Sequence, residues 1–480
     1  MKFPVYVKPP QSGKTRDAII EPMKKSLARG RIPVVVLPSR IQLQKQTTRR
    51  LIDEQMGLTE QNIGRFDTGV RNRNSSSECV EGISKGSLRA LVVLNNSSGI
   101  TKLIYTMVKS EKKFDIIVDE IHGFFNMDFR EPNEEPFWEK LREGKTIKLD
   151  PSTRMSILFG LIRSKEFTFS GTTATVSYIA QSKLMKELDL VPLVVKLKTP
   201  ECYLGYDQIP KKIYSGDFRD CLRSIIRNNP LGTVTMCHVD RKQETHYQVA
   251  ELWIDSCLAD GVSRDNILAL VDNGDGYTLF NWAKIVKNYD KSKTSEPWKI
   301  IDTYKNKFNY THIGIFGDRC MSESNTYQKC VGDTNCPIND LVVVPFNHSL
   351  DNMTIMIQKI GRIFGNDTIG GNRRTIWFPR GYKSRVELGL HFDELIQNEC
   401  NLARVNLRAI RKRVEPKSDG TKIGRFRDSL DSSRLYTRKE IITLLGEYKY
   451  PDAMLRSLCR ENNYSVHLLE QIGDNYRLKS

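Results

Sequence analysis

Two adjacent carboxylates, Asp119 and Glu120, end the apolar run 114–118. The run reads as a strand buried on both faces, and unpaired charges are costly to bury, so packing alone does not explain two acids there. Ligands bind at the carboxyl edge of a parallel sheet, where one carboxylate can hold Mg²⁺ and its neighbour can orient or deprotonate a water. The alternative is a solvated acidic turn. A phosphate-binding loop elsewhere in the sequence would favour the ligand site over the turn.

Residues 8–15, Lys-Pro-Pro-Gln-Ser-Gly-Lys-Thr, supply such a loop. They lie between an expected strand at 3–7 and a helical pattern that continues to about residue 26, and this context is required for phosphate binding by backbone N–H groups and a helix N-terminus. Lys14 would reach the β- and γ-phosphates, and the hydroxyl of Thr15 would bind Mg²⁺. The predicted nucleotide-binding residues are Gln11, Ser12, Gly13, Lys14 and Thr15, with Thr15 and Asp119 at the metal.

The elements that must position these residues alternate between strands and helices. Strands are predicted at 3–7, 32–37, 63–66, 89–94, 114–118, 166–169 and 190–195, and then at 233–238, 266–271, 312–316, 341–345 and 374–378. Helices are expected over 218–227 and 351–363, and a long helical stretch over 277–308. Such alternation predicts parallel, doubly wound α/β sheets with the polar residues gathered at the C-terminal strand ends.

Length and composition indicate a multidomain globular protein. The 480 residues suffice for two or three domains, and a hydrophobic content of 39% with 27% charged residues is typical of soluble proteins. The sequence holds no apolar run long enough to span a bilayer, and its first residues lack the apolar core of a secretory leader. The ten cysteines are scattered, so an intracellular protein (cytoplasm or nucleus) with reduced thiols and no secretion signal is expected. Cys320, Cys330 and Cys336 lack the short paired spacing of zinc ligands, which favours free thiols over a metal site.

The formal net charge of +17 points to a polyanionic partner, DNA or RNA, although an inert basic surface is the alternative. Residues 404–427 hold nine Lys or Arg against two acidic residues, so Arg411, Lys412 and Arg413 are candidate nucleic-acid contacts. Residues 398–480 form a basic C-terminal extension with two expected short helices and a terminal strand at 475–478. A small, mostly helical or winged-helix-like module is the prediction for this region.

Taken together, these motifs resemble those of superfamily 2 helicases of the DExH type. Asp119-Glu120-Ile121-His122 fits Asp-Glu-x-His outright, and Gln358-Lys359-Ile360-Gly361-Arg362 fits Gln-x-x-Gly-Arg. Three weaker matches are Lys8–Thr15 to the phosphate loop, Pro38-Ser39-Arg40 to Pro-Thr-Arg, and Thr173-Ala174-Thr175 to Ser-Ala-Thr. Gly317-Asp318-Arg319, followed by Ser324-Asn325-Thr326, loosely resembles the motif that precedes Gln-x-x-Gly-Arg in the family. The resemblance covers about residues 1–397.

The resemblance implies two RecA-like domains, at 1–200 and 201–397, that hold ATP and Mg²⁺ between them. By the same resemblance Asp119 serves Mg²⁺, Glu120 is the catalytic base, and Gln358 and Arg362 act from the opposing domain, with Arg362 as an arginine finger. Single-stranded nucleic acid would cross both domains, mainly through its phosphates. The residues expected along that path are Arg40, Asn95, Ser324 and Thr326.

Three positions depart from the family pattern. Lys8 stands in place of the first glycine of the phosphate loop, Gln11 replaces a later glycine, and Gly365 stands where the last motif usually continues with a second arginine. The hypothesis is a weaker finger, or one supplied by Arg319 or Arg373, because loss of a finger costs roughly 10³-fold or more in turnover. A start close to the phosphate loop is also typical of compact helicases of large DNA viruses, which makes a viral source one expectation.

The expected function is a nucleic-acid-dependent ATPase or helicase that unwinds DNA or RNA or translocates on it. A translocase or remodelling ATPase that does not separate strands shares every motif and stays open. A non-catalytic nucleic-acid-binding scaffold is a further alternative, because of Gln11 and Gly365. A small-molecule kinase would explain neither the net charge of +17 nor the second α/β unit.

Overall fold

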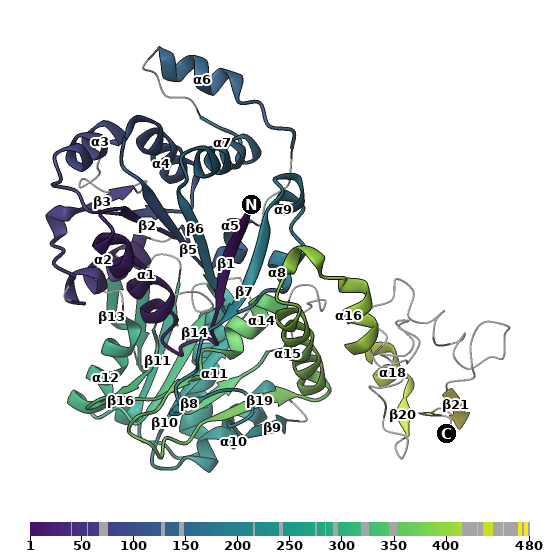
Figure 1. The fold of residues 1–480 in the computed structure, drawn as a ribbon. Helices are drawn as coiled ribbons and strands as arrows, with labels where there is room; N and C mark the ends of the chain where they lie inside the picture. The colour runs from purple at the N-terminus through teal and green to yellow at the C-terminus, as the bar shows by residue number, and fades with distance from the viewer. Residues whose placement is uncertain are drawn as a thin grey trace. The chain divides into compact units, whose positions relative to one another are not determined.

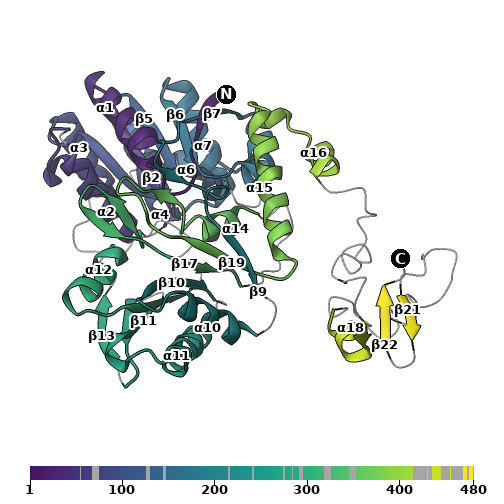
Figure 2. The same ribbon diagram turned by 90° about the horizontal axis from the view of Figure 1, so that it is seen from below.

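The computed structural model describes residues 1–480 except 40, 55, 67–74, 126–129, 144–147, 215–216, 240–242, 274–275, 284, 291–295, 318–325, 345–352, 415–429, 431–434, 445–454, 456–468, 473–474 and 479–480. Residues Met1–Leu407 form one compact unit and residues Arg408–Ser480 form a second. The first unit holds two large sheets, which are seen from two directions in Figure 1 and Figure 2. The predicted α/β architecture with two sheets is confirmed.

The first sheet has seven strands in the order β3-β4-β2-β5-β6-β1-β7, and all neighbouring pairs run parallel. The strands are β1 (Lys2–Val7), β2 (Ile32–Leu37), β3 (Ile63–Phe66), β4 (Ala90–Leu94), β5 (Phe114–Asp119), β6 (Thr168–Thr173) and β7 (Val191–Lys196). Parallel strands end at the same edge of a sheet, so the polar residues after β1, β2, β4, β5 and β6 are brought together there.

Helices bury the central strands of this sheet. Every residue of β2 and β5 is buried, as continuous apolar runs predict for strands covered on both faces. On one face, Ile19 and Met23 join Leu51 and Val35 in a single apolar cluster. The helical elements are η1 (Arg16–Ile20), α1 (Glu21–Ala28), α2 (Ile41–Asp53), η2 (Glu60–Asn62), α3 (Ser76–Ser84), α4 (Ser97–Lys109), α5 (Ile121–Phe124), α6 (Glu135–Arg142), α7 (Pro151–Ser164), α8 (Ser177–Ala180) and α9 (Lys183–Glu187).

The second sheet has eight strands in the order β13-β12-β11-β14-β10-β17-β19-β9. The strands are β9 (Lys211–Tyr214), β10 (Thr233–His238), β11 (Ile267–Asp272), β12 (Gly276–Phe280), β13 (Ile285–Asp290), β14 (His312–Gly317), β17 (Asp340–Val342) and β19 (Thr375–Pro379). The strands from β11 to β9 in this order run parallel. The two remaining pairs, β11 with β12 and β12 with β13, are antiparallel.

Two apolar clusters cover the two faces of the second sheet, which is therefore doubly wound. One cluster contains residues of α10 (Phe218–Asn228) and α11 (Gln243–Ala259), and the other contains residues of α12 (Pro297–Lys307), α14 (Met353–Ile360) and α15 (Tyr382–Asn398). Figure 2 shows these helices on opposite sides of the strands. The smaller elements are β8 (Tyr203–Leu204) paired with β18 (Gly365–Asn366), β15 (Lys329–Val331) paired with β16 (Thr334–Cys336), η3 (Arg264–Asn266) and η5 (Leu402–Arg404).

The helical stretch predicted over 277–308 is wrong in its first half, because 276–290 holds the hairpin of β12 and β13. Tyr277 and Leu279 are buried while Thr278 and Phe280 between and after them are half-buried, which is the period-two alternation of a strand. The helix α12 begins only at Pro297. Proline is favourable at the first position of a helix, so Pro297 is the sequence signal for the start of α12.

The strand predicted at 166–169 is also displaced, since β6 covers Thr168–Thr173. Gly171, expected beyond the strand, pairs with Val118 of β5 inside it. A Cβ at position 171 would lie 2.0 Å from Cδ1 of Ile121, so only glycine lets the segment after β5 approach β6 this closely. Gly171 therefore helps to place the residues around Glu120.

In the second unit the structure describes α16 (Leu407–Val414, which starts at the boundary), α18 (Arg438–Leu444) and three strands in the antiparallel order β20-β22-β21. The strands are β20 (Tyr436–Thr437), β21 (Leu469–Ile472) and β22 (Asn475–Leu478), and β22 coincides with the predicted terminal strand. Among the described residues of the chain, none of the helices combines the length and the apolar character needed to cross a membrane.

Candidate nucleotide site

A cavity of about 560 Å³ lies between the two sheets of the first unit. Its first-sheet side is formed by the loop after β1 and by the end of β5, and its second-sheet side by residues of α14, β15 and β18. Of the predicted site residues, those that line it are Gln11, Gly13, Lys14, Thr15, Asp119, Glu120, Gln358, Arg362 and Thr326. The fold thus brings together residues that are separated by more than 300 positions in the sequence.

The loop 8–15 is held by its own side chains. The hydroxyl of Ser12 donates to the carbonyl of Pro9 at 2.6 Å, and Gly13 has φ of +91°, a backbone conformation that favours glycine. Lys8, which stands at the place of the missing first glycine, is 2% exposed and forms an ion pair with Asp17 of η1. Lys8 therefore ties the start of the loop to the helical segment after it and does not enter the cavity.

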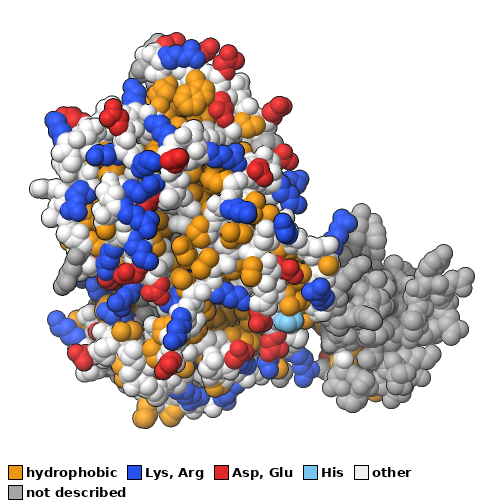
Figure 3. Space-filling model, viewed as in Figure 1, with side chains coloured by type: hydrophobic (Ala, Val, Ile, Leu, Met, Phe, Trp, Pro, Cys, Tyr) orange, Lys and Arg blue, Asp and Glu red, His pale blue; other side chains and the backbone are white. Residues whose placement is uncertain are grey.

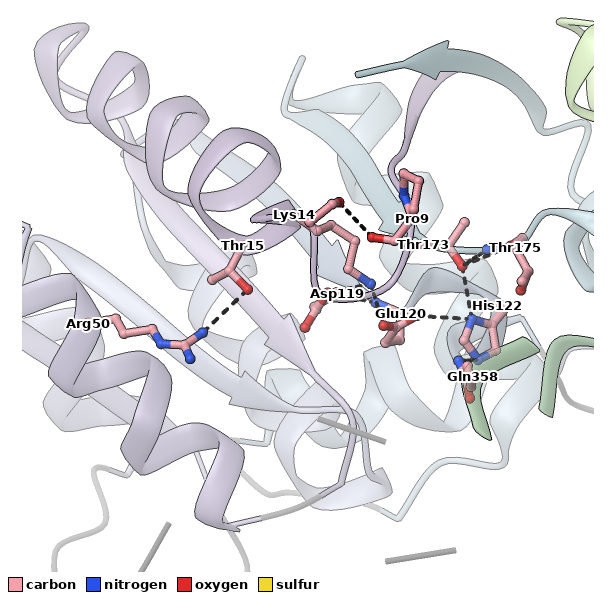
Figure 4. Close-up of polar contacts among 11 residues, drawn as sticks. Pro9, Lys14, Thr15, Arg50, Asp119, Glu120, His122, Thr173, Thr175 and Gln358 are labelled. Carbon is pink, nitrogen blue, oxygen red and sulfur yellow. Dashed lines mark hydrogen bonds and ion pairs between the residues drawn. The ribbon is translucent and has the colours of Figure 1, made fainter. Parts of the chain in front are cut away.

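Lys14 joins the phosphate loop to the two carboxylates. Its Nζ forms an ion pair with Oε1 of Glu120 and lies 3.7 Å from Oδ1 of Asp119, as Figure 4 shows. Burial disfavours the charge on Lys14, but the two carboxylates outweigh it and hold the lysine pKa above its ordinary value. The lysine is therefore a cation at neutral pH, as a group that binds phosphate must be.

The two carboxylates differ electrostatically. Burial raises the pKa of Asp119, whereas Lys14 overcomes the same burial at Glu120 and lowers the pKa of that carboxyl group. Glu120 adopts a left-handed backbone with φ of +48°, an unfavourable conformation for a side chain of this type that is often found at functional sites. Within the described part of the chain, Oε2 of Glu120 is buried and accepts no hydrogen bond. That oxygen can therefore accept a proton from a bound water.

His122 connects Glu120 to β6 and to the second sheet. Its Nδ1 lies 3.1 Å from Oγ1 of Thr173 and 3.4 Å from Oε2 of Glu120, and its Nε2 lies 3.2 Å from the side-chain nitrogen of Gln358. Oγ1 of Thr173 donates to the carbonyl of Thr175, so it accepts from Nδ1–H of His122, while Nε2 accepts from the amide of Gln358. A neutral histidine protonated on Nδ1 satisfies these contacts, which Figure 4 displays.

The segment after Thr173 is bound to α15 as well. Asp393 of α15 accepts the backbone N–H groups of Val176 and Ser177 at 2.9 Å each, and Gln397 donates to its second oxygen at 2.9 Å. Asp393 is 3% exposed, and burial raises its pKa. Thr173–Thr175 is therefore linked to the second sheet from two directions, through Gln358 and through Asp393.

The oxygen ligands at the loop suit Mg²⁺. Thr15 offers a hydroxyl and Asp119 a carboxylate, and hard oxygens of this kind are what Mg²⁺ prefers. Arg50 of α2 also reaches this place, because its Nη1 donates to the Thr15 hydroxyl at 3.5 Å. Burial lowers the pKa of Arg50, and carboxylates of Glu296 and Asp119 offset part of that effect.

On the second-sheet side, Arg362 is 8% exposed and lies within electrostatic reach of Lys14 and Glu120. Its backbone is fixed by two amides, since the side chains of Gln11 and Gln328 each donate to its carbonyl at 2.9 Å. Arg373, considered above as a substitute finger, is exposed and donates to the carbonyl of Asn228. It does not line the cavity, so its role as a substitute finger stays a hypothesis without support from the geometry. Arg319 lies outside the described residues.

The predicted nucleic-acid contacts fall in several places. Asn95 follows β4, where its carbonyl accepts from the hydroxyl of Ser39 at 2.5 Å and its side chain donates to the carbonyl of Gly123 at 3.5 Å. Thr326 lines the cavity, and its carbonyl accepts the N–H of Trp298.

Of the other predicted contacts, Arg40, Ser324 and the side chain of Lys412 lie outside the described residues. In α16, Arg411 is half-buried and Arg413 is exposed. The contacts stay predictions.

Three contributors were not singled out from the sequence. His122 was recognised as part of a motif without a role, although its ring links three other groups. Gln328 follows the poorly matched segment at 317–326, and its contact with Arg362 carries no sequence signature. Arg50 sits on a helix that reads as an ordinary amphipathic surface, so only the fold shows that it reaches Thr15.

No protein-family model matches the chain, and no curated protein matches it in sequence. Three of the solved structures similar to it are helicases. The DUF1998 helicase MrfA bound to DNA and AMPPNP is 13% identical with a TM-score of 0.46, over 100% of this chain and 57% of that chain. The DEAD-box helicase Mss116 bound to ssRNA and UDP-BeF is 11% identical with a TM-score of 0.48, over 95% and 79%. The Escherichia coli DEAH/RHA helicase HrpB is 13% identical with a TM-score of 0.45, over 96% and 52%.

The chain thus spans little more than half the length of MrfA and of HrpB. At these identities and scores the similarity is a resemblance alone, and no property of those helicases follows from it for this chain.

Proposed function

We propose that the chain is a nucleic-acid-dependent ATPase of the DExH helicase type, which couples ATP hydrolysis to unwinding of, or translocation on, DNA or RNA. The observation that carries the proposal is the meeting around one cavity of Lys14 and the Asp119-Glu120 pair from the first sheet with Gln358 and Arg362 from the second. Phosphoryl transfer is catalysed mainly by positioning and charge stabilisation, and these residues supply a phosphate-binding cation, a base and a finger.

Each residue has a separate role in the proposal. Lys14 binds the β- and γ-phosphates and exchanges its ion pair with Glu120 for the phosphate oxygens. Glu120, ionised at neutral pH, accepts a proton from the attacking water through Oε2, which accepts no hydrogen bond among the described residues. Arg362 stabilises negative charge that develops on the transferring phosphoryl group. Thr15 and Asp119 would hold Mg²⁺, which when bound neutralises charge on the β- and γ-phosphates.

The link from hydrolysis to nucleic acid runs through His122. Its ring joins the catalytic base to Thr173 and to Gln358. Loss of the transferred phosphate would therefore change contacts of residues on both sheets. Nucleic acid enters the proposal through the net charge of +17 and the basic run 404–427. On the face drawn in Figure 3, Lys and Arg side chains are spread over the first unit among fewer acidic ones.

ATP turnover measured with and without single-stranded DNA, single-stranded RNA and duplex tests this proposal. We expect stimulation by at least one of these polymers, with a steep decrease as salt rises from 50 to about 200 mM because phosphate contacts release counterions. Turnover that none of the polymers changes would contradict the nucleic-acid part. A strand-displacement assay on the stimulating polymer then separates a helicase from a translocase that leaves the duplex intact.

A further inference from the structure

Gln11 has a strained backbone at a place where glycine would be relaxed. Its φ is +57°, in the left-handed region that side chains other than those of Asn and Asp rarely adopt. Such a conformation is unfavourable in a non-glycine residue. A glutamine that persists there suggests a use for its side chain.

The side chain of Gln11 contacts the second-sheet side of the cavity. Its Nε2 donates to the carbonyl of Arg362 at 2.9 Å, and this bond joins the phosphate loop to the segment that carries the proposed finger. The neighbouring residue is in close contact with the same segment, because a Cβ on Gly361 would lie 2.5 Å from Cγ of Pro10. The hydroxyl of Tyr203, on β8, also donates to the carbonyl of Pro10 at 3.0 Å.

Gly365 lies beside Gln11 at the same contact between the two sides. It has φ of +140°, and a Cβ placed on it would lie 3.4 Å from Cβ of Gln11 and 3.6 Å from the carbonyl oxygen of Gln11. A side chain at 365 would be strained by this backbone conformation, and its Cβ would be in ordinary van der Waals contact with Gln11. Gln11 and Gly365, two of the positions at which the sequence departs from the helicase pattern, therefore lie next to each other.

We propose that Gln11 is a positioning residue for Arg362, and that Gln11 and Gly365 act as a pair. This inference rests on the proposed function. The amide of Gln11 holds the backbone carbonyl of Arg362 against the phosphate loop, so that the guanidinium faces Lys14 and Glu120. The contact sets turnover without adding to the binding of the nucleotide.

Gln328 is not equivalent to Gln11, although it donates to the same carbonyl. It is 5% exposed, also donates to the carbonyl of Phe364, and accepts the N–H of Ile338, so its contacts described by the structure stay within the second-sheet part of the unit. Gln328 fixes the shape of the finger segment, whereas Gln11 fixes its position relative to the phosphates. The two roles are separable by experiment.

The test compares Gln11→Gly, which relaxes the backbone, with Gln11→Met, which keeps the length without a charge and cannot donate. For each full-length variant, affinities for Mg·ADP and for Mg·ADP·AlF₄⁻ are measured together with kcat and KM for ATP. We expect both variants to bind ADP within twofold of the wild type and to lose about tenfold in affinity for ADP·AlF₄⁻ and in kcat, which corresponds to one lost hydrogen bond. Gln61→Met, at an exposed glutamine of η2, is the matched control and should change neither.

Three results would overturn the inference. Equal affinities of wild type and variants for ADP·AlF₄⁻ would show that the amide positions nothing. Equal weakening of ADP and ADP·AlF₄⁻, with a lower melting temperature, would show that Gln11 only maintains the loop. A wild type that neither hydrolyses ATP nor prefers ADP·AlF₄⁻ to ADP would remove the proposed function, and the inference with it.

The pairing of Gln11 with Gly365 is tested by a double-mutant cycle. Gly365→Ala alone should lower kcat about tenfold, because strain at the positive φ would shift the segment of Arg362 relative to the amide of Gln11. In the Gln11→Gly background that amide is already absent, so the same substitution should cost clearly less. Additive effects on kcat would contradict the proposed pair.

Discussion

The two sides of the cavity hold their functional groups in different ways. On the first-sheet side, charged and polar side chains hold one another, as Lys14 does with Glu120 and as His122 does with Thr173. On the second-sheet side, Arg362 is held by its backbone carbonyl, which accepts from Gln11 and Gln328. The first side is a preformed charge cluster, whereas the second is a segment placed by contacts across the cavity. Loss of the phosphate-binding Lys14 on the first side should therefore impair binding, whereas loss of Arg362 on the second side should slow turnover.

Lys14→Ala should give the largest effect on binding. The substitution removes the phosphate-binding cation and leaves Asp119 and Glu120 as buried carboxylates without their lysine partner. We expect nucleotide affinity to fall by about 100-fold or more, as truncation of one member of a buried charge pair commonly does. Titration with a fluorescent ATP analogue measures it, and an affinity within fivefold of the wild type would mean that the phosphates bind elsewhere.

Arg362→Ala tests the other side of the comparison. Loss of an arginine finger costs about 10³-fold in kcat, and KM for ATP should change little because the group acts mainly in the transition state. Arg373→Ala is the matched control, since that arginine is exposed and contacts the carbonyl of Asn228. Steady-state kinetics of both variants decide the assignment. A large loss at 373 with none at 362 would reverse it.

His122→Ala addresses the connection between the two sides. Because the ring joins Glu120 to Thr173 and Gln358, we expect the nucleic-acid-stimulated rate to fall by about tenfold and the basal rate to fall less. ATPase assays at saturating single-stranded polymer, compared with assays without it, give the two rates. Equal losses in both would place His122 in the chemistry itself and not in the coupling.

Asp393→Asn should have the smallest effect, and the effect should depend on pH. Burial raises the pKa of Asp393 in the folded protein, so ionisation of this carboxyl group opposes folding. The contribution of Asp393 to stability is largest below its unfolded pKa of about 3.9, and it is lost as the pH rises through the pKa of the folded state. The stability of wild type relative to Asp393→Asn should thus decrease by about 1 kcal/mol or more from pH 4 towards neutrality. Urea unfolding at several pH values measures this difference. Asp255→Asn, at an exposed residue of α11, serves as the control, and a difference that rises with pH would contradict the explanation.

Much of the fold could be predicted because the buried strands are continuous apolar runs. The runs at 32–37 and 114–118 matched β2 and β5 closely, since their burial on both faces leaves the sequence little freedom. The hairpin at 276–290 was missed because its alternation is short, and because polar residues such as Asn281 and Lys287 fit a helix surface equally well. The register of β6 was missed because glycine and threonine in 170–173 read as loop, whereas packing against Ile121 requires that glycine.

The candidate site could be predicted only where a motif is local in sequence. Lys14 and the pair Asp119-Glu120 each stand in a short recognisable pattern, so their convergence at the strand ends followed from a parallel sheet. The contact between Gln11 and Arg362 joins residues that are far apart in the chain, and neither residue type indicates the other. Contacts of this kind depend on how two sheets face each other, which no local pattern specifies.

The central claim is that one cavity between the two sheets hydrolyses ATP with Glu120 as its base. The most direct measurement is phosphate release from ATP by the wild type and by Glu120→Gln, with Mg²⁺ and the best stimulating polymer present. The claim predicts turnover in the wild type and a loss of about 10²-fold or more in the variant, with nucleotide binding retained. Equal turnover by the two proteins would contradict it.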